Sequence, residues 1–253
     1  MAYHKKTAQY YDYFVDKRDL PYFRRLMLQL GGPVLVPGCG TGRVVFDLIS
    51  AGLEVVGVDN SPYMLDVARD KHDRSGPTIK GRLELVEADM VDMPLRRTFA
   101  SALVAGGSFA HLLTLADQVS CLVSINRLLD SGGKLVLDLF PPDMTLLTDG
   151  ATVSKVVHID GGVSILRTIH RQSDLNLQRC NLTVIYEQYK GNVLVERVLD
   201  ELAISLLFPR EVQLLLEHTG FKVEKISGDL QGGSFSATSK RMIVVASKHD
   251  DTR

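Results

Sequence analysis

The chain lacks tryptophan, has only three cysteines, and contains no apolar run near the roughly 18 residues that a membrane-spanning helix needs. Cys39, Cys121 and Cys180 are too few and too widely spaced for a disulfide framework or a Cys-x-x-Cys site. The N-terminal segment has no apolar stretch of the kind that a signal peptide requires, and no histidines have metal-ligand spacing. We therefore expect a cytoplasmic protein with no membrane partner and no metal.

The chain also lacks an excess of either positive or negative charge. The 253 residues include 29 Lys and Arg against 30 Asp and Glu, which gives a formal charge of −1, and no basic run interrupts the chain. A surface that binds a phosphate backbone needs a concentrated positive field. We expect no nucleic-acid partner, and the length and 45% hydrophobic content instead predict an ordinary globular core.

Short apolar runs alternate with helical patterns through the first 140 residues. Strands are predicted at residues 33–37, 53–58, 83–88, 99–105 and 134–140, and helices at residues 19–30, 43–49, 62–71 and 115–129. Strands that are apolar throughout and separated by helices are typical of a parallel sheet buried on both faces. The sequence therefore predicts an α/β fold with a doubly wound, mostly parallel sheet.

The pattern changes after Pro141 and Pro142. Polar and apolar residues alternate from about residue 153 to 208, which predicts an antiparallel insert of three or four strands. A helix at 211–218 and strands at 221–230 and 242–247 then return to the first sheet, which gives it seven strands, one of them antiparallel. We expect a main domain of residues 1–149 and 209–248, an insert of residues 150–208, and a frayed tail of residues 249–253.

A glycine-rich turn follows the first predicted strand. Such a turn between a buried strand and a helix lets the backbone approach a ligand closely and directs free helix N–H groups at it. Asp59 ends the second strand, 21 residues after Gly38, where a carboxylate can accept both ribose hydroxyls. Arg43 stands where a dinucleotide-binding fingerprint would have its third glycine, which disfavours a nicotinamide oxidoreductase.

Four segments together resemble the class I S-adenosylmethionine-dependent methyltransferases, which have a Rossmann-like fold. They are VLVPGCGTGR (34–43), VVGVDNSPYML (55–65), VEADM (86–90) and LLDSGGKLVLD (128–138). The resemblance implies S-adenosylmethionine as the cofactor and S-adenosylhomocysteine as the product. This family usually carries an acidic residue where the chain has Val36, so its loss would weaken cofactor binding or pass that role to another residue.

The resemblance also implies which residues contact the cofactor. The glycine turn would hold its methionine part, Asp59 its ribose, and Asp89 with Met90 its adenine, while the segment from Ala105 would lie beneath the sulfonium. The expected cofactor-binding residues are Tyr11, Gly38, Cys39, Gly40, Thr41, Gly42, Arg43, Asp59, Asn60, Met64, Asp89, Met90, Ala105 and Gly106.

The insert and the segment Tyr10-Tyr11-Asp12-Tyr13 resemble the branch with glycine and sarcosine N-methyltransferases and amino-sugar N,N-dimethyltransferases. That branch implies a small-molecule acceptor, most often an amine, and an insert that covers the substrate or forms a homodimer contact. A small-molecule O-methyltransferase is the alternative within this chemistry. A cofactor-binding protein without catalysis is an alternative from another class.

His111 is the candidate catalytic base. It lies just beyond the fourth strand, at the edge where open α/β sheets bind ligands, and an imidazole can take the proton that an amine or hydroxyl acceptor loses. The segment Ser108-Phe109-Ala110-His111-Leu112 also matches the Ser-x-x-His-Leu pattern of the amino-sugar enzymes. Tyr11 is the second catalytic candidate, through a hydroxyl near the transferred methyl. The alternatives are a loop histidine and a core-packing tyrosine.

Overall fold

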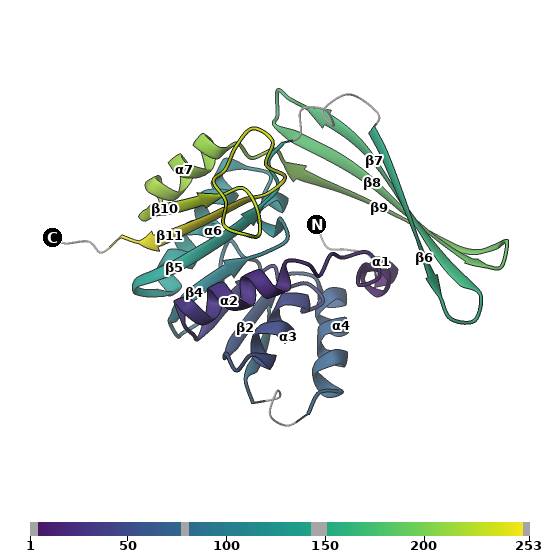
Figure 1. Ribbon diagram of the computed structural model, residues 1–253, viewed down its shortest axis with the longest axis horizontal. Helices are drawn as coiled ribbons and strands as arrows, with labels where there is room; N and C mark the ends of the chain where they lie inside the picture. Colours follow the sequence, from purple (N-terminus) through teal and green to yellow (C-terminus); the bar gives the residue numbers. More distant parts are fainter. Residues whose placement is uncertain (1–4, 77–80, 143–150, 250–253) are drawn as a thin grey trace.

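Two β-sheets organise the protein (Figure 1). The computed structural model describes residues 5–76, 81–142 and 151–249. The larger sheet has helices on both faces, whereas the smaller sheet extends away from it as a long, twisted antiparallel ribbon. The described part of the chain contains no helix that is long and apolar enough to cross a membrane.

The larger sheet has seven strands in the order β10-β11-β5-β4-β1-β2-β3. Strands β1 to β5 are parallel to their neighbours within this group, and β11 runs antiparallel to both β5 and β10. The predicted doubly wound sheet with one antiparallel member is therefore confirmed. Its strands are β1 (Val34–Pro37), β2 (Val55–Asp59), β3 (Leu83–Glu87), β4 (Phe99–Val104), β5 (Leu129–Leu139), β10 (Phe221–Ser227) and β11 (Met242–Lys248).

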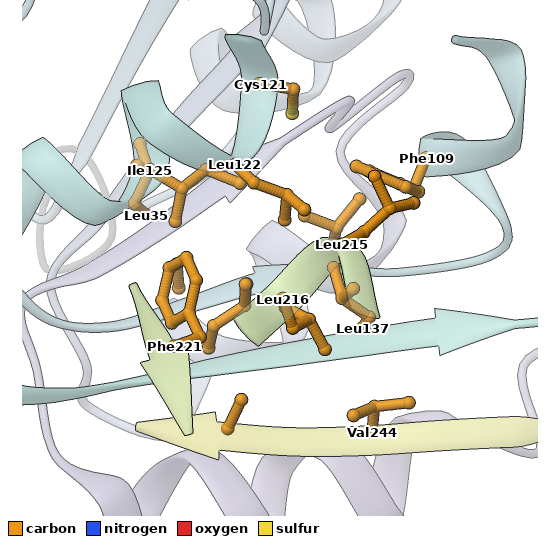
Figure 2. Packing of buried hydrophobic residues seen from close by; sticks show 14 of the residues in the cluster. Leu35, Phe109, Cys121, Leu122, Ile125, Leu137, Leu215, Leu216, Phe221 and Val244 are labelled. Carbon is orange, nitrogen blue, oxygen red and sulfur yellow. The ribbon is translucent and has the colours of Figure 1, made fainter. Parts of the chain in front are cut away.

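Alternation along β1 sends neighbouring side chains into two separate cores. Leu35 belongs to a cluster on one face, whereas Val34 and Val36 belong to a cluster on the other. Figure 2 shows the Leu35 side, where apolar residues of α6 and α7 meet strands β5 and β11. The helices are α1 (Lys5–Tyr11), α2 (Leu20–Leu30), α3 (Arg43–Ser50), α4 (Pro62–Asp73), the short 3-10 helix η1 (Ser108–His111), α6 (Leu115–Leu128) and α7 (Pro209–His218).

The boundary between α6 and β5 differs from the prediction. We expected a helix to residue 129 and a strand from 134, but the helix ends at Leu128 and the strand begins at Leu129. The register with β4 shifts between Phe99, which pairs with Leu129, and Ser101, which pairs with Lys134. The turn-forming residues between these pairs are therefore accommodated as a bulge inside the strand.

The insert forms a separate four-stranded sheet in the order β6-β7-β8-β9. All three pairings are antiparallel, as the alternation of polar and apolar residues predicts. The strands are β6 (Ala151–Ile159), β7 (Val163–Asp174), β8 (Arg179–Lys190) and β9 (Val193–Ser205).

Helix α1 and the residues after it join the two sheets (Figure 1). Tyr10 and Phe14 pack against Tyr186 of β8, with ring centroids 5.7 and 5.6 Å away. The Tyr10 hydroxyl also donates a 2.8 Å hydrogen bond to Gln188. The N-terminal segment therefore positions the insert over the carboxyl ends of the parallel strands.

Candidate active site

The glycine turn between β1 and α3 forms one wall of the candidate site. Gly38 has φ +66°, and a Cβ atom there would lie 2.6 Å from the Cβ of Ser108, so a larger residue would clash with η1. Gly40 has φ +55°, but a Cβ atom there would meet no heavy atom within 4 Å. The turn is therefore tight on its inner side and open at Gly40, where a ligand can reach the backbone.

Asp59 lies at the end of β2 and is fixed against this turn. One carboxylate oxygen accepts a 2.7 Å hydrogen bond from the Gly40 N–H, and the other accepts a 2.9 Å bond from the Ser61 N–H. Burial raises the pKa of Asp59, while these two N–H groups oppose that shift. The structure thus brings together the turn and the acid that the sequence predicts as ribose ligand.

The residues predicted at the adenine lie beside Asp59. Asn60 donates a 3.0 Å hydrogen bond to Asp89, and the Met90 methyl lies 3.2 Å from the position of a Cβ atom on Gly38. These three side chains therefore gather beside the glycine turn. Met64 differs from them because it is buried inside the protein, under the start of α4.

Cys39 and Thr41 are both buried in the turn, but they contact different parts of the protein. The Cys39 sulfur is buried against β2, 3.0 Å from where a Cβ atom of Gly57 would lie, and burial raises the pKa of its thiol well above the usual value. Cys39 therefore packs as a small residue and is no thiolate nucleophile at neutral pH. The Thr41 hydroxyl donates a 2.6 Å hydrogen bond to Asp12, just after α1.

A buried ionic network that the sequence did not reveal supports the other wall. Arg43 forms an ion pair with Asp19, which is 1% exposed. Arg241 lies 3.5 Å from the same carboxylate and donates two 2.8 Å hydrogen bonds to Asp138, which is fully buried. Asp138 in turn accepts a 2.8 Å hydrogen bond from the Gly106 N–H. Helix α2, strand β11 and the loop after β4 are thereby connected.

Val36 stands where the resemblance predicts an acidic residue, and the network supplies charged groups that Val36 does not. Val36 is 2% exposed and packs in an apolar cluster, so it has no polar function. Arg43 reaches within 3.8 Å of the position of a Cβ atom on Gly106, which places a guanidinium and the Asp19 carboxylate between the glycine turn and the β4 loop. Ala105, the first residue of that loop, is almost fully buried.

His111 faces a cavity of about 910 Å³ between the two sheets. Its side chain is exposed to this space, while desolvation by the surrounding protein lowers the pKa of His111 below its ordinary value of 6.5. Among the residues that the structure describes, the lining holds two basic side chains, Arg171 and Lys240, and no carboxylate. Most of the remaining lining is apolar and comes from β7, β8, β9, the segment after β5 and the loop before β11, including Phe140, Ile169, Leu182, Ile204 and Phe235.

Comparisons with known proteins agree with this geometry. A family model described as a methyltransferase domain matches residues 35–137. A cypemycin N-terminal methyltransferase from a Streptomyces species is 28% identical over 224 residues, which span 85% of this chain and 82% of the relative. The solved structure of the CcbJ methyltransferase from Streptomyces caelestis shares the fold with a TM-score of 0.82 at 24% identity, over 96% of each chain.

The sugar N-methyltransferase KedS8 from Streptoalloteichus sp ATCC 53650 also shares the fold. Its TM-score is 0.77 at 19% identity, over 99% of this chain and 94% of that chain. Residues 35–137 form a methyltransferase domain, and the chain is an S-adenosylmethionine-dependent methyltransferase. S-Adenosylmethionine is its cofactor, and solved structures with this fold contain that molecule or its demethylated product.

The site of this methyltransferase fits the cofactor in three respects. The backbone at Gly40 is open to a ligand, and the Asp59 carboxylate is held beside it by two N–H groups that leave further lone pairs. Arg43 supplies a cation near Gly106, which suits an amino-acid carboxylate. The contacts of each individual residue with the cofactor remain predictions.

Tyr11, the second catalytic candidate, is the last residue of α1. Burial raises the pKa of its hydroxyl; the charges of Arg43 and of Arg167, on β7, lower that pKa, and those of Asp12 and Asp59 raise it. Tyr11 is absent from the described lining of the cavity that His111 faces. Tyr11 is therefore close to charged groups of both the glycine-turn side and the insert, outside the described lining of the cavity that His111 faces.

Sequence reasoning missed the residues that complete both walls. Asp138 interrupts an apolar strand pattern, which is a signal for a buried, paired carboxylate. Asp19 and Arg241 carried no comparable signal because their partners are distant in the chain. Arg171 and Ser173 were hidden in the insert, since only the strand register shows that both face the cavity.

Proposed function

We propose that this enzyme transfers a methyl group to the nitrogen of a small-molecule amine, with His111 accepting the proton that the nitrogen loses. One observation carries the proposal. His111 opens into a mainly apolar cavity next to Gly106, and the described lining offers cations but no carboxylate. The printed names of an N-terminal methyltransferase and a sugar N-methyltransferase among the similar proteins support nitrogen as the acceptor atom.

The lining favours the reactive form of an amine. An ammonium group has no lone pair, so it must lose a proton before it can act as a nucleophile. An apolar cavity that also contains Arg171 disfavours a second positive charge and lowers the pKa of a bound ammonium. A carboxylate in the lining would have the opposite effect. The cavity therefore presents a neutral amine to the methyl donor.

The residues of the glycine turn, with Asp59 and Arg43, hold the cofactor in this proposal. When bound, S-adenosylmethionine supplies a methyl group on a positively charged sulfur. The lone pair of the acceptor nitrogen forms the new N–C bond while the C–S bond breaks and leaves its electron pair on sulfur. The imidazole of His111 takes one proton from the nitrogen, which restores a neutral amine.

His111 is suited to this role at neutral pH. Because its pKa is lowered, the ring is unprotonated and has a lone pair available. The rest of the rate enhancement comes from alignment, which the walls around the site provide. Tyr11 contributes from the cofactor side in this proposal, by directing its hydroxyl dipole toward the charged methyl group.

We also propose a division of labour between the two sheets. Residues 1–149 and 209–248 bind the cofactor, and residues 150–208 cover the acceptor, because β7, β8 and β9 supply much of the cavity lining. We propose a second role for the insert as well. Its edge strands β6 and β9 have neighbours on one side only, so they are the proposed contact of a homodimer.

A pair of acceptors that differ only at the nucleophile tests the reaction class. The enzyme is incubated with methyl-labelled S-adenosylmethionine and either glucosamine 6-phosphate or glucose 6-phosphate, and the labelled product is located by NMR. We expect methyl transfer to the nitrogen of the amine and none to the sugar hydroxyls. Methylation of oxygen in both compounds would contradict the proposal and identify an O-methyltransferase.

A further inference from the structure

The β7 side of the acceptor cavity has an arrangement of polar groups that the methyl transfer does not use. Ile169, Arg171 and Ser173 alternate along β7 and all three line the cavity. The residue between the first two, His170, faces the other side, where its ring nitrogen lies 2.8 Å from the Thr152 hydroxyl. One strand face thus presents an apolar residue followed by two hydrogen-bond donors.

Both donors lack partners among the described residues. The Ser173 hydroxyl is inaccessible to solvent and makes no hydrogen bond. The Arg171 guanidinium is partly buried, and no hydrogen bond or ion pair joins it to another side chain in the described ranges. A buried hydroxyl without a partner costs about 1–3 kcal/mol, and because Ser173 lines the cavity, rotation about its Cα–Cβ bond would present this hydroxyl to a ligand beside Arg171. These two side chains together are equipped for a ligand that accepts hydrogen bonds.

The strand register fixes where these donors lie relative to His111. Ser173 pairs with Cys180, which pairs with Ile204 of β9. The next residue, Ser205, donates a 2.7 Å hydrogen bond to the carbonyl of Leu112, beside His111. The row of paired residues across the insert that contains Ser173 therefore lies next to His111.

Arg171 lies one row further from His111. It pairs with Leu182, two residues along β8 from Cys180, so its Cα is about 6–7 Å beyond that of Ser173. Asp200, the nearest inner-face carboxylate of β9 in register, pairs with Val184 in the following row and does not line the cavity. The Arg171 side of the cavity is thus cationic.

We infer that Arg171 and Ser173 form a subsite for an anionic group of the acceptor, a carboxylate or a phosphate, held away from the reacting nitrogen. The inference rests on the proposed function, because the cavity must be the acceptor site. Arg171 offers a planar fork of donors that matches both anions. Ser173 adds a hydroxyl donor to the lining. The acceptor class is therefore an amine that carries a negative charge several ångströms from its nitrogen.

Two sets of four compounds test the subsite separately from the nucleophile. The phosphate set is glucosamine 6-phosphate, glucosamine, glucose 6-phosphate and glucose. The carboxylate set is 6-aminohexanoate, 6-aminohexanamide, 6-hydroxyhexanoate and 6-hydroxyhexanamide. Each compound is assayed by release of S-adenosylhomocysteine, and its binding to the enzyme saturated with S-adenosylhomocysteine is measured by calorimetry.

We expect the anionic member of at least one set to bind and react about 10-fold to 100-fold better than its neutral counterpart. The set that shows the difference identifies the anion as phosphate or carboxylate. Equal values for anionic and neutral members, or binding of no member, would overturn the subsite. Reaction of the hydroxyl compounds instead of the amines would overturn the proposed function while leaving the effect of charge measurable.

Substitutions assign the effect to the two side chains. Arg171→Gln should remove the preference for the anion, Arg171→Lys should keep part of it, and Ser173→Ala should reduce it by a few-fold. Lys190→Gln removes an exposed positive charge of the same sheet outside the cavity and should change nothing. An unchanged preference in Arg171→Gln, with S-adenosylhomocysteine binding intact, would overturn the assignment.

Discussion

The Asp12 carboxylate accepts a 2.6 Å hydrogen bond from the Thr41 hydroxyl, which ties the end of α1 to the glycine turn. Lys71 completes the contact, with its ammonium nitrogen 2.5 Å from the other Asp12 oxygen and 2.8 Å from the Thr41 carbonyl oxygen. Because α1 also packs on the insert, this cluster connects the cofactor-binding turn to the cover of the acceptor cavity.

Asp12→Ala should weaken the binding of S-adenosylhomocysteine by roughly 3-fold to 10-fold, measured by calorimetry. The reason is that the glycine turn loses a hydrogen bond worth about 1 kcal/mol in a partly exposed setting. Asp66→Ala is the matched control, since its carboxylate pairs only with exposed Arg69 on α4. Equal affinities for both variants and the native enzyme would show that the Asp12 contact does not support the turn.

Asp59→Ala should weaken the same binding by about 1.5–3 kcal/mol, the range for hydrogen bonds to a charged group. The variant removes both the expected ribose acceptor and the support of the Gly40 N–H. Glu87→Ala is the control, because Glu87 is exposed and occupies the paired position on the neighbouring strand β3. A native affinity in Asp59→Ala would remove Asp59 from the cofactor site.

Arg241→Met should lower the free energy of unfolding by about 3–5 kcal/mol, because the fully buried Asp138 carboxylate would lose its charge partner. Denaturant titration measures the change. Arg97→Met removes an exposed partner of Glu54 and should cost at most about 1 kcal/mol. Equal losses in the two variants would mean that the network contributes no more than a surface pair.

Local pattern was sufficient to predict the main sheet. β1 is apolar throughout and is buried on both faces, and the glycine turn and Asp59 follow the ends of adjacent parallel strands, where topology brings them together. The bulge at the start of β5 was missed because Gly132 and Gly133 resemble an ordinary turn. Only the pairing of β4 with β5 converts them into part of a strand.

The acceptor side required the three-dimensional structure. His111 could be placed at a strand end from the sequence, but its cavity depends on the insert, whose packing is set by Tyr10 and Phe14 against Tyr186. The inward direction of Arg171 depends on the register of β7 with β8. A one-residue shift would turn it outward, and the sequence alone does not specify that register.

The pH dependence of turnover should reflect the lowered pKa of His111. The base is active when unprotonated, so kcat measured with saturating acceptor should fall to half of its plateau value only at a pH below 6.5, the ordinary histidine pKa. His111→Gln should lose this acid limb together with most of the activity. A native rate that is already halved at or above pH 6.5 would contradict the assignment of His111 as a base with a lowered pKa.

The most direct test of the account compares His111→Ala with His158→Ala, which alters a histidine of the insert whose ring nitrogen lies 2.8 Å from the Ser164 hydroxyl. The rate of methyl transfer to the acceptor amine and the calorimetric binding of S-adenosylhomocysteine are measured for both variants. We predict that His111→Ala lowers turnover by roughly 10²-fold to 10⁴-fold with unchanged binding, while His158→Ala retains native values. Native turnover in His111→Ala would contradict the central claim that this histidine takes the acceptor's proton.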